Sequence, residues 1–277
     1  MKNIKKTLAI IFSSVFVLTA LSGCGSSSAG NTGSDTSKSE KKEITIGATP
    51  KPHEEILEKV KPILQKEGYE LKIKEFTDYV TPNKALASGE LDANFFQHIP
   101  YLEDYNKKNG TDLVPVAKVH IEPMGIYSNK IKNLKDLKDG AEVAIPNDAT
   151  NGSRALKLLA KEGLVKVKDG ELISKLDIME NKKNLKVQEL DAPQLPRVLG
   201  DVDAAVINTN YALEANLNPT KDALAIESKE SPYANIIAVK KEDKDKPYVK
   251  ALVKAVNSPE IKKFIEDNYK GSIIPAF

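Results

Sequence analysis

Residues 44–68 read ITIGATPKPHEEILEKVKPILQKEG, in which a short β-branched run is followed by a helical pattern. Ile44 to Ile46 is apolar and β-branched, as buried strands are. Apolar residues then recur at helical spacing from Ile56 to Leu64, and Gly68 is a typical helix stop. Because Pro62 lies inside this period, we expect a kinked or interrupted helix. A strand followed directly by a helix is the basic unit of an α/β fold.

The same alternation continues to the C-terminus, which predicts the α/β class for the whole chain. Two further helices are expected between Pro247 and Tyr269, divided near Ser258 and Pro259 and ended by Gly271. More short apolar runs occupy residues 71–73, 143–145, 204–207 and 236–239. In open sheets of this class, ligands bind beyond the carboxyl ends of the strands. The segments expected there are residues 52–53, 96–98, 147–154 and 208–211.

The first residues have the pattern of a lipoprotein export signal. Three lysines precede an apolar run from Leu8 to Leu21, which is shorter than the ~20 residues of a membrane span. Small residues at positions 22 and 23 favour cleavage immediately before Cys24, the only cysteine. We expect residues 1–23 to be removed and Cys24 to carry two or more acyl chains, because one chain binds a membrane only marginally. The alternative is a signal-anchor helix with an ordinary thiol.

Residues 24–42 predict a lipidated cysteine followed by a flexible tether. Almost all of them are Gly, Ser, Thr, Asn or charged, so they bury too little apolar surface to fold. Removal of the three signal lysines turns 41 basic and 39 acidic residues into 38 and 39, a net charge of −1. Nothing in this balance favours a nucleic-acid partner. The rest of the chain is long enough for one large domain or two lobes.

Several motifs, in the same order along the chain, carry a family resemblance. They are GATPKPHEEIL (47–57), FTDYVTPNKALASGELDANFFQHIPY (76–101), HIEPMG (120–125), IPNDATN (145–151), AVINTNY (205–211) and SPYAN (231–235). From Ile44 to Phe277 the chain resembles the methionine-binding lipoproteins of the NlpA type. These proteins are the substrate-capturing subunits of bacterial ABC importers for methionine.

The resemblance implies a two-lobe fold of the type II periplasmic-binding-protein kind, with one ligand in the cleft between the lobes. Lobe 1 is expected to comprise residues 43–123 and 235–277, and lobe 2 residues 124–234, with crossings near Pro123 and Ala234. The implied protein is a non-enzymatic receptor without cofactors. It is expected to be a monomer on the extracytoplasmic face of the cell membrane, anchored through Cys24, that delivers methionine to an ABC permease and its ATPase. L-methionine, D-methionine, a methionine-containing dipeptide and another amino acid all stay open as ligands.

Arg154 is the first candidate ligand residue, because only it and Arg197 are arginines among the 41 basic residues. We expect it in the first turn of a helix from Ala155 to Ala160, where the helix N-terminus and Gly152 support anion binding. Its planar fork suits a ligand carboxylate. The alternative is an ion pair with a surface carboxylate. Arg197 is expected on a solvated helix face.

Asparagines form the second group of candidates, since one amide can donate to a carboxylate and accept from an ammonium. Asn210 in a strand-to-helix turn and Asn235 beside the second crossing are the choices that the resemblance supports. Asn151 and Asn208 are interpreted as loop or cap residues instead.

Tyr79, Phe96, His98 and Tyr101 are predicted to form an apolar box with one polar corner, suited to a thioether side chain. Strand alternation places Phe96 and His98 on one face with Asn94, opposite Phe95 and Gln97. Glu122 is a candidate acceptor for the ligand ammonium, although a partner lysine explains it equally well.

Two other classes of function are weighed against the receptor. His53, His98 and His120 with Glu122 could supply a metal site, but no two histidines have the local spacing of metal ligands. A hydrolase would need an activated nucleophile, and the chain has neither a Gly-x-Ser-x-Gly turn nor a cysteine besides Cys24. Neither class is favoured, and no metal is expected.

Overall fold

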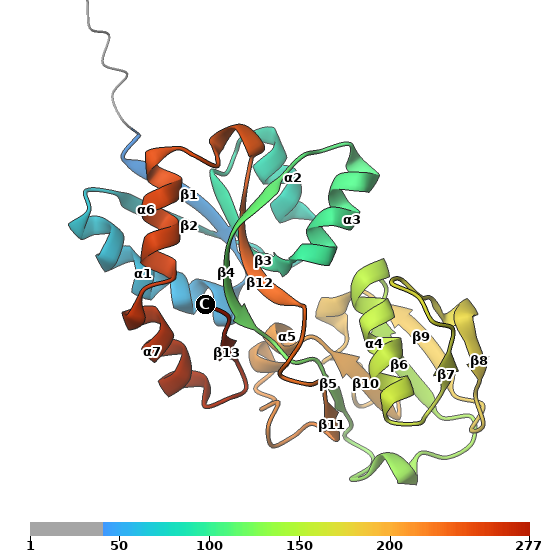
Figure 1. Ribbon diagram of the computed structural model, residues 1–277. Helices are drawn as coiled ribbons and strands as arrows, with labels where there is room; N and C mark the ends of the chain where they lie inside the picture. The colour runs from blue at the N-terminus through green and yellow to red at the C-terminus, as the bar shows by residue number, and fades with distance from the viewer. Residues whose placement is uncertain (1–40) are drawn as a thin grey trace, which may run out of the picture. The chain divides into compact units, whose positions relative to one another are not determined.

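The computed structural model describes residues 41–277. The predicted signal peptide, Cys24 and nearly all of the predicted tether lie outside the described residues. Within residues 41–277, no helix has both the length and the apolar character that crossing a membrane requires. Two mixed β-sheets, each covered by helices, organise this part of the chain (Figure 1).

The first sheet has six strands in the order β13-β4-β12-β3-β1-β2. Its strands are β1 (Glu43–Ala48), β2 (Glu70–Glu75), β3 (Ala93–His98), β4 (Val114–Ile121), β12 (Ala234–Val239) and β13 (Ile274–Pro275). β1 is parallel to β2 and β3, whereas β12 is antiparallel to β3 and β4. The helical segments of this half are η1 (Pro50–Glu54), α1 (Glu55–Lys66), α2 (Thr81–Ser88), α3 (Ile99–Asn109), η5 (Lys241–Asp243), α6 (Pro247–Val256) and α7 (Pro259–Tyr269).

The second sheet has five strands in the order β11-β5-β10-β6-β9. They are β5 (Gly125–Tyr127), β6 (Glu142–Pro146), β9 (Lys186–Leu190), β10 (Ala204–Ile207) and β11 (Ala225–Ile226), beside a separate pair β7 (Lys166–Val167) and β8 (Ile178–Glu180). Its helical segments are η2 (Leu134–Asp136), α4 (Ala149–Lys161), η3 (Lys175–Asp177), η4 (Ala192–Gln194) and α5 (Thr209–Glu214).

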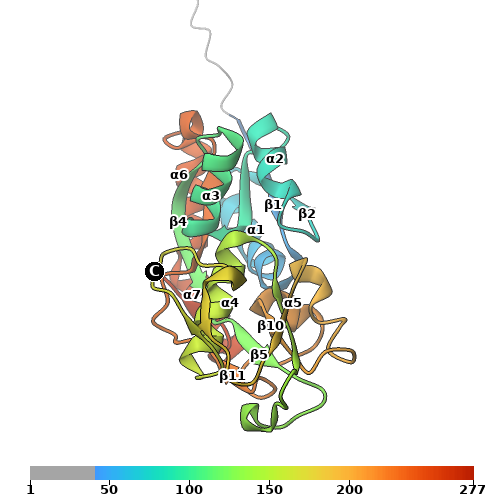
Figure 2. The same ribbon diagram turned by 90° about the vertical axis from the view of Figure 1, so that its right-hand side faces the viewer.

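Each sheet is packed on both faces. Side chains of α1, α6 and α7 form one core with the first sheet, and α2 and α3 contribute to a smaller core on its other face. In the second sheet, α4 covers one face, and the segment from η4 to α5 covers the other. The chain passes between the sheets twice, through residues 122–124 and 227–233. α3 of the first half lies beside α4 of the second in both views (Figures 1 and 2).

The five runs predicted as strands lie in β1, β2, β6, β10 and β12, and the two C-terminal helices divide at Ser258. α1 is continuous through Pro62, so of the two expected outcomes, a kink or an interruption, the interruption is wrong. Its buried residues Ile56, Leu57, Val60 and Leu64 explain why. Burial of one such side chain contributes ~1.5–3 kcal/mol, so four together outweigh the ~3 kcal/mol cost of an interior proline.

The predicted start of α4 is wrong. The helix begins at Ala149 rather than Ala155, because the Asp148 carboxylate accepts a hydrogen bond from the Asn151 N–H at 2.9 Å and caps the first turn. Arg154 is therefore in the second turn, away from the free N–H groups of the helix end. Gly152 permits a close approach to a strand rather than to a ligand, because a Cβ there would lie 2.8 Å from the Pro146 carbonyl oxygen.

β3 also differs from the prediction, since residues 96–98 are part of the strand and do not follow it. Its pairing with β12 shifts between Gln97 and Phe95, so Phe96 is an extra, bulged residue. The bulge breaks strict alternation. Asn94 accepts a hydrogen bond from the Gln97 amide at 2.9 Å, so the expectation that Asn94 shares a face with Phe96, opposite Gln97, is wrong.

Candidate ligand-binding site

A pocket with an empty volume of about 330 Å³ is lined by side chains from both sheets and their connections. The pocket brings together all eight residues proposed from the sequence: Tyr79, Phe96, His98, Tyr101, Glu122, Arg154, Asn210 and Asn235. Four more residues line it that were not proposed: Gln97, Asn151, Asn208 and Thr209. Asn151 and Asn208 are thus more than cap or loop residues.

Aromatic rings form one side of the pocket. The centroid of Tyr79 lies 6.0 Å from those of Phe96 and Tyr101, and Phe96 lies 5.9 Å from Tyr101. The His98 ring closes the group at 6.3 Å from Tyr101. These rings come from three segments: the loop before α2, the end of β3 and the first turn of α3. They make an apolar box of the kind that accepts a flexible, unbranched side chain.

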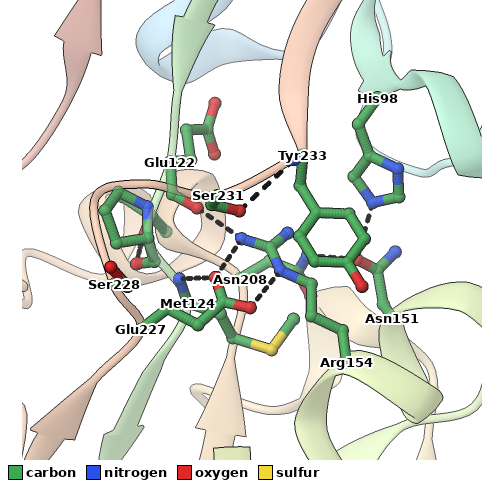
Figure 3. A network of polar contacts seen from close by, with 12 residues as sticks. His98, Glu122, Met124, Asn151, Arg154, Asn208, Glu227, Ser228, Ser231 and Tyr233 are labelled. Carbon is green, nitrogen blue, oxygen red and sulfur yellow. Dashed lines mark hydrogen bonds and ion pairs between the residues drawn. The ribbon is translucent and has the colours of Figure 1, made fainter. Parts of the chain in front are cut away.

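Arg154 forms an ion pair with Glu227, a residue that was not proposed from the sequence (Figure 3). Its Nε donates to Glu227 Oε1 at 2.7 Å, and its Nη2 donates to Glu227 Oε2 at 2.5 Å and to the Glu122 carbonyl at 2.6 Å. The Tyr233 ring stacks over the guanidinium at 4.5 Å. The guanidinium is therefore not wholly available for a ligand carboxylate, contrary to the prediction from the sequence, because Nε and Nη2 already donate to oxygens of the protein. Among residues 41–277, Nη1 is the guanidinium nitrogen that has no hydrogen bond.

Four asparagine amides also line the pocket, and two of them contact the aromatic group directly. Asn208 donates to Asn151 Oδ1 at 2.9 Å, and Tyr79 donates its hydroxyl proton to Asn210 Oδ1 at 2.5 Å. The buried Asn208 Oδ1 has no partner within the described chain, whereas the Asn210 amide interacts with the Glu214 carboxyl but forms no well-aligned hydrogen bond through Nδ2. An unpaired buried polar atom costs ~1–3 kcal/mol, so the site is best satisfied by a ligand that brings a donor to Asn208.

Glu122 is buried and surrounded by hydrogen-bond donors. Its Oε1 lies 2.7 Å from His120 Nε2, and its Oε2 accepts from the Asn210 N–H at 3.1 Å. Burial raises the pKa of this carboxyl, while His53 and Arg154 oppose the shift. The partner lysine weighed from the sequence is not found among residues 41–277. Histidines occupy that position instead.

Folding brings His53, His120 and Glu122 together, with one ligand atom of each within 4.8 Å of the others. The lack of metal-ligand spacing between histidines in the sequence therefore does not show whether they meet in the fold, because distant segments supply the three groups. All three atoms already take part in hydrogen bonds: His53 Nε2 lies 3.0 Å from Asn235 Oδ1, and His120 Nε2 contacts Glu122. His98, the third histidine of the metal hypothesis, is not in this group and lies 3.2 Å from Asn151 Oδ1.

The histidines around the site are neutral at physiological pH. Burial lowers the pKa of His98 to about 3, with a further contribution from the positive charge of Arg154. Burial likewise lowers the pKa of His53 to about 4 and that of His120 to about 3. The ion pair at the pocket is thus Arg154 with Glu227, and Glu122 adds a buried carboxyl whose pKa is raised. Neutral amides and rings make up the rest of the lining.

A family model described as NlpA lipoprotein matches residues 44–277. The methionine-binding lipoprotein MetQ of Bacillus subtilis (strain 168) is 44% identical over 278 residues, which cover 97% of this chain and 96% of the relative. The D-methionine-binding lipoprotein MetQ of Escherichia coli (strain K12) is 44% identical over 236 residues, which cover 83% of this chain and 87% of the relative.

Solved structures of similar sequence share the fold. A nutrient binding protein from Burkholderia cenocepacia, bound to methionine, superposes with a TM-score of 0.83 at 54% identity and covers 84% of this chain and 100% of its own. A putative methionine-binding lipoprotein from Bacillus subtilis gives a TM-score of 0.81 at 44% identity, with 84% and 98% covered. The fold is therefore the two-lobe, type II substrate-binding fold.

Proposed function

Because the chain belongs to the NlpA lipoprotein family, we propose that it is a non-enzymatic receptor that binds methionine and delivers it to the permease of an ABC importer. The observation that carries the proposal is the pocket itself. Aromatic rings, amides and charged groups line one pocket, and the buried acceptor Asn208 Oδ1 there has no partner within the described chain. A free amino acid with an apolar side chain has groups for both the rings and the polar atoms.

The proposed ligand places its side chain among Tyr79, Phe96, His98 and Tyr101. Its carboxylate is bound by Arg154 Nη1 and by the amides of Asn210 and Asn235, because these groups present N–H donors. Its ammonium is bound by Glu122 and by the unpaired Asn208 Oδ1. Sulfur against aromatic edges contributes ~0.3–1.5 kcal/mol, which favours methionine over an aliphatic side chain of equal length.

The proposed lobes are residues 43–123 with 235–277, and 124–234. The ligand then contacts groups from both, such as Phe96 from the first and Arg154 from the second. Binding from two sides favours a closed form that a permease could distinguish from the empty receptor. A methionine-containing dipeptide and another amino acid are the alternatives that the ligand panel below separates.

Calorimetry and thermal shift on ligand-free protein test the proposal. L-methionine, D-methionine, norleucine, alanine, methionine methyl ester and a methionine-containing dipeptide form the panel. Methionine at 100 times its dissociation constant should stabilise the folded state by ~2.7 kcal/mol. Norleucine should bind less tightly, alanine should leave the box empty, and the ester should lose the carboxylate contacts. Silence of both methionine enantiomers, with a large shift from another ligand, would contradict the proposal.

Membrane anchoring is a separate part of the proposal and rests on Cys24 in its cleavage motif. Cys24→Ala should give protein that is unlipidated, either soluble or unprocessed, since no other cysteine offers an attachment. Fractionation of cells followed by mass determination of the mature N-terminus measures this. Recovery of the Cys24→Ala variant in mature form from the membrane fraction would show that the anchor lies elsewhere.

A further inference from the structure

We propose that His53 is a positioning residue, which orients the Asn235 amide so that its NH₂ group faces the ligand. The inference rests on the proposed function, because it assumes that Asn235 contacts the ligand. His53 follows β1 in the turn η1 and is 1% exposed. It does not line the pocket, whereas Asn235 on β12 does. A hydrogen bond of 3.0 Å joins His53 Nε2 to Asn235 Oδ1 across 182 positions of sequence.

The surroundings of His53 decide which of its nitrogens carries the proton. Nε2 lies 3.3 Å from Glu122 Oε1 as well as 3.0 Å from the Asn235 amide. Glu122 Oε1 lies closer to His120 Nε2, at 2.7 Å, so a protonated Glu122 would donate there and still present a lone pair to His53. A bare Nε2 lone pair beside that oxygen would be repelled whether Glu122 is ionised or protonated, so Nε2 is the protonated nitrogen. The ring is neutral, so Nδ1 is then an acceptor, although the Lys51 backbone carbonyl also lies within hydrogen-bond reach of the ring. The hydroxyl of Thr49, 2.7 Å away and fully buried, supplies the matching donor.

This proton arrangement determines how the Asn235 amide is turned. An Nε2–H donor requires the amide oxygen on its side, because the amide NH₂ would place two donors against each other. Asn235 therefore points Oδ1 at His53 and keeps Nδ2 for the pocket. The pocket gains an N–H donor in place of an acceptor, which suits a ligand carboxylate. A chain of contacts from Thr49 through His53 thus decides the polarity of a residue that the ligand touches.

The test compares two substitutions of similar volume. His53→Leu removes the donor, while His53→Gln keeps an N–H at a comparable reach. Methionine affinity is measured by calorimetry in wild type, in both variants, in Asn235→Ala and in the double variant His53→Leu/Asn235→Ala. Loss of a buried hydrogen-bond partner predicts a loss in affinity on the order of tenfold or more for His53→Leu. His53→Gln should stay within a few-fold of wild type.

The double variant shows whether His53→Leu weakens methionine binding through Asn235 or by a general disturbance of the pocket. If His53 acts through Asn235, His53→Leu should add no further loss in the Asn235→Ala background. A further loss of the same size there, or equal binding by wild type and His53→Leu, overturns the proposal. If His53→Leu does not fold, Thr49→Val takes its place, because it removes only the hydroxyl that holds Nδ1. A partial loss that appears with Asn235 present and vanishes in the Asn235→Ala background is then expected.

Two controls separate the proposed role of His53 from a wrong assignment of the ligand and from a metal site. A wild-type protein that does not bind methionine contradicts the proposed function, and this inference fails with it. Binding that is weakened in wild type by a chelator and restored by a divalent metal ion alone would show that His53, His120 and Glu122 hold a metal. That outcome overturns the hydrogen-bond role of His53. Unchanged binding in chelator is the expected result.

Discussion

Arg154 combines the two interpretations that its sequence context allowed. Its guanidinium pairs with a carboxylate of the protein, as the ion-pair alternative held, and it also lines the ligand pocket. The partner is Glu227, whose side chain is 14% exposed against 3% for Arg154. The same carboxylate accepts from the Met124 N–H at 3.0 Å. Both segments that join the two sheets are thus tied to one side chain of α4.

Glu227→Gln should lower the free energy of unfolding by about 2–4 kcal/mol, toward the lower end of the cost of breaking a buried ion pair. The reason is that Arg154 would keep its charge while losing its counter-ion. Chemical denaturation of the ligand-free variant measures the change. A loss below about 1 kcal/mol would mean that solvent already screens this pair.

Glu189→Gln is the matched control for that substitution. Glu189 pairs with Lys175 at 2.8 Å, but the two side chains are 33% and 45% exposed. An exposed pair contributes ~0–1 kcal/mol, so this variant should unfold almost like wild type. Equal losses in the two variants would show that removal of any glutamate charge, rather than the Arg154 contact, causes the effect.

α4 depends on one close approach to the strand that precedes it. Gly152 lies in its first turns, where a Cβ would meet the Pro146 carbonyl oxygen of β6 at 2.8 Å. That oxygen belongs to the backbone, so the helix or the strand must move to accommodate a methyl group. Asn151 and Arg154 line the pocket from the same helix, so a displaced helix also displaces them.

Gly152→Ala should therefore destabilise the protein by about 1–2 kcal/mol, because overpacking costs ~1–3 kcal/mol and the better helix propensity of alanine returns up to ~1 kcal/mol. Methionine affinity should fall as well. Gly200→Ala is the control, because nothing lies within 4 Å of its added Cβ. Denaturation and calorimetry of both variants provide the comparison, and a Gly152→Ala protein as stable as wild type would show that α4 shifts without cost.

All three histidines of the chain are buried, which gives the whole molecule a predictable response to acid. Their pKa values are lowered from 6.5 to about 4 for His53, about 3 for His98 and about 3 for His120. Between pH 6.5 and about 4, the unfolded chain therefore takes up protons that the folded chain does not. The free energy of unfolding should fall with decreasing pH in that window, by ~1.4 kcal/mol per pH unit for each histidine that stays neutral.

Two carboxyl groups, Glu122 and Glu214, oppose part of this effect because burial raises the pKa of each. The pKa of Glu214 is raised from 4.5 to about 7 by burial and by Glu122, so the folded chain binds a proton there first and gains stability as pH falls through that range. Denaturation at pH 7, 6 and 5 gives the net slope. Imidazole resonances in NMR isolate the histidines, and none should titrate between pH 8 and 5. A midpoint near 6.5 for any of them would contradict its burial.

Much of the secondary structure was predictable because it depends on neighbouring residues. The β-branched runs in β1, β6, β10 and β12 and the apolar spacing of α1 are local patterns, and each predicted the correct element. The errors arose where contacts between segments override the local pattern. The Asp148 cap begins α4 six residues earlier than expected, and the bulge at Phe96 follows from pairing with β12.

The α/β class, the family resemblance and eight residues that line one pocket can all be predicted from the amino-acid sequence. Motif identity and local periodicity carry that information. The hydrogen-bond partner of each of these groups, by contrast, is set by contacts between distant segments of the folded chain. Glu227 lies 73 positions from Arg154, and His53 lies 182 positions from Asn235. Orientation of a guanidinium or an amide depends on the atoms packed around it, and spacing along the chain does not encode which distant atoms those are.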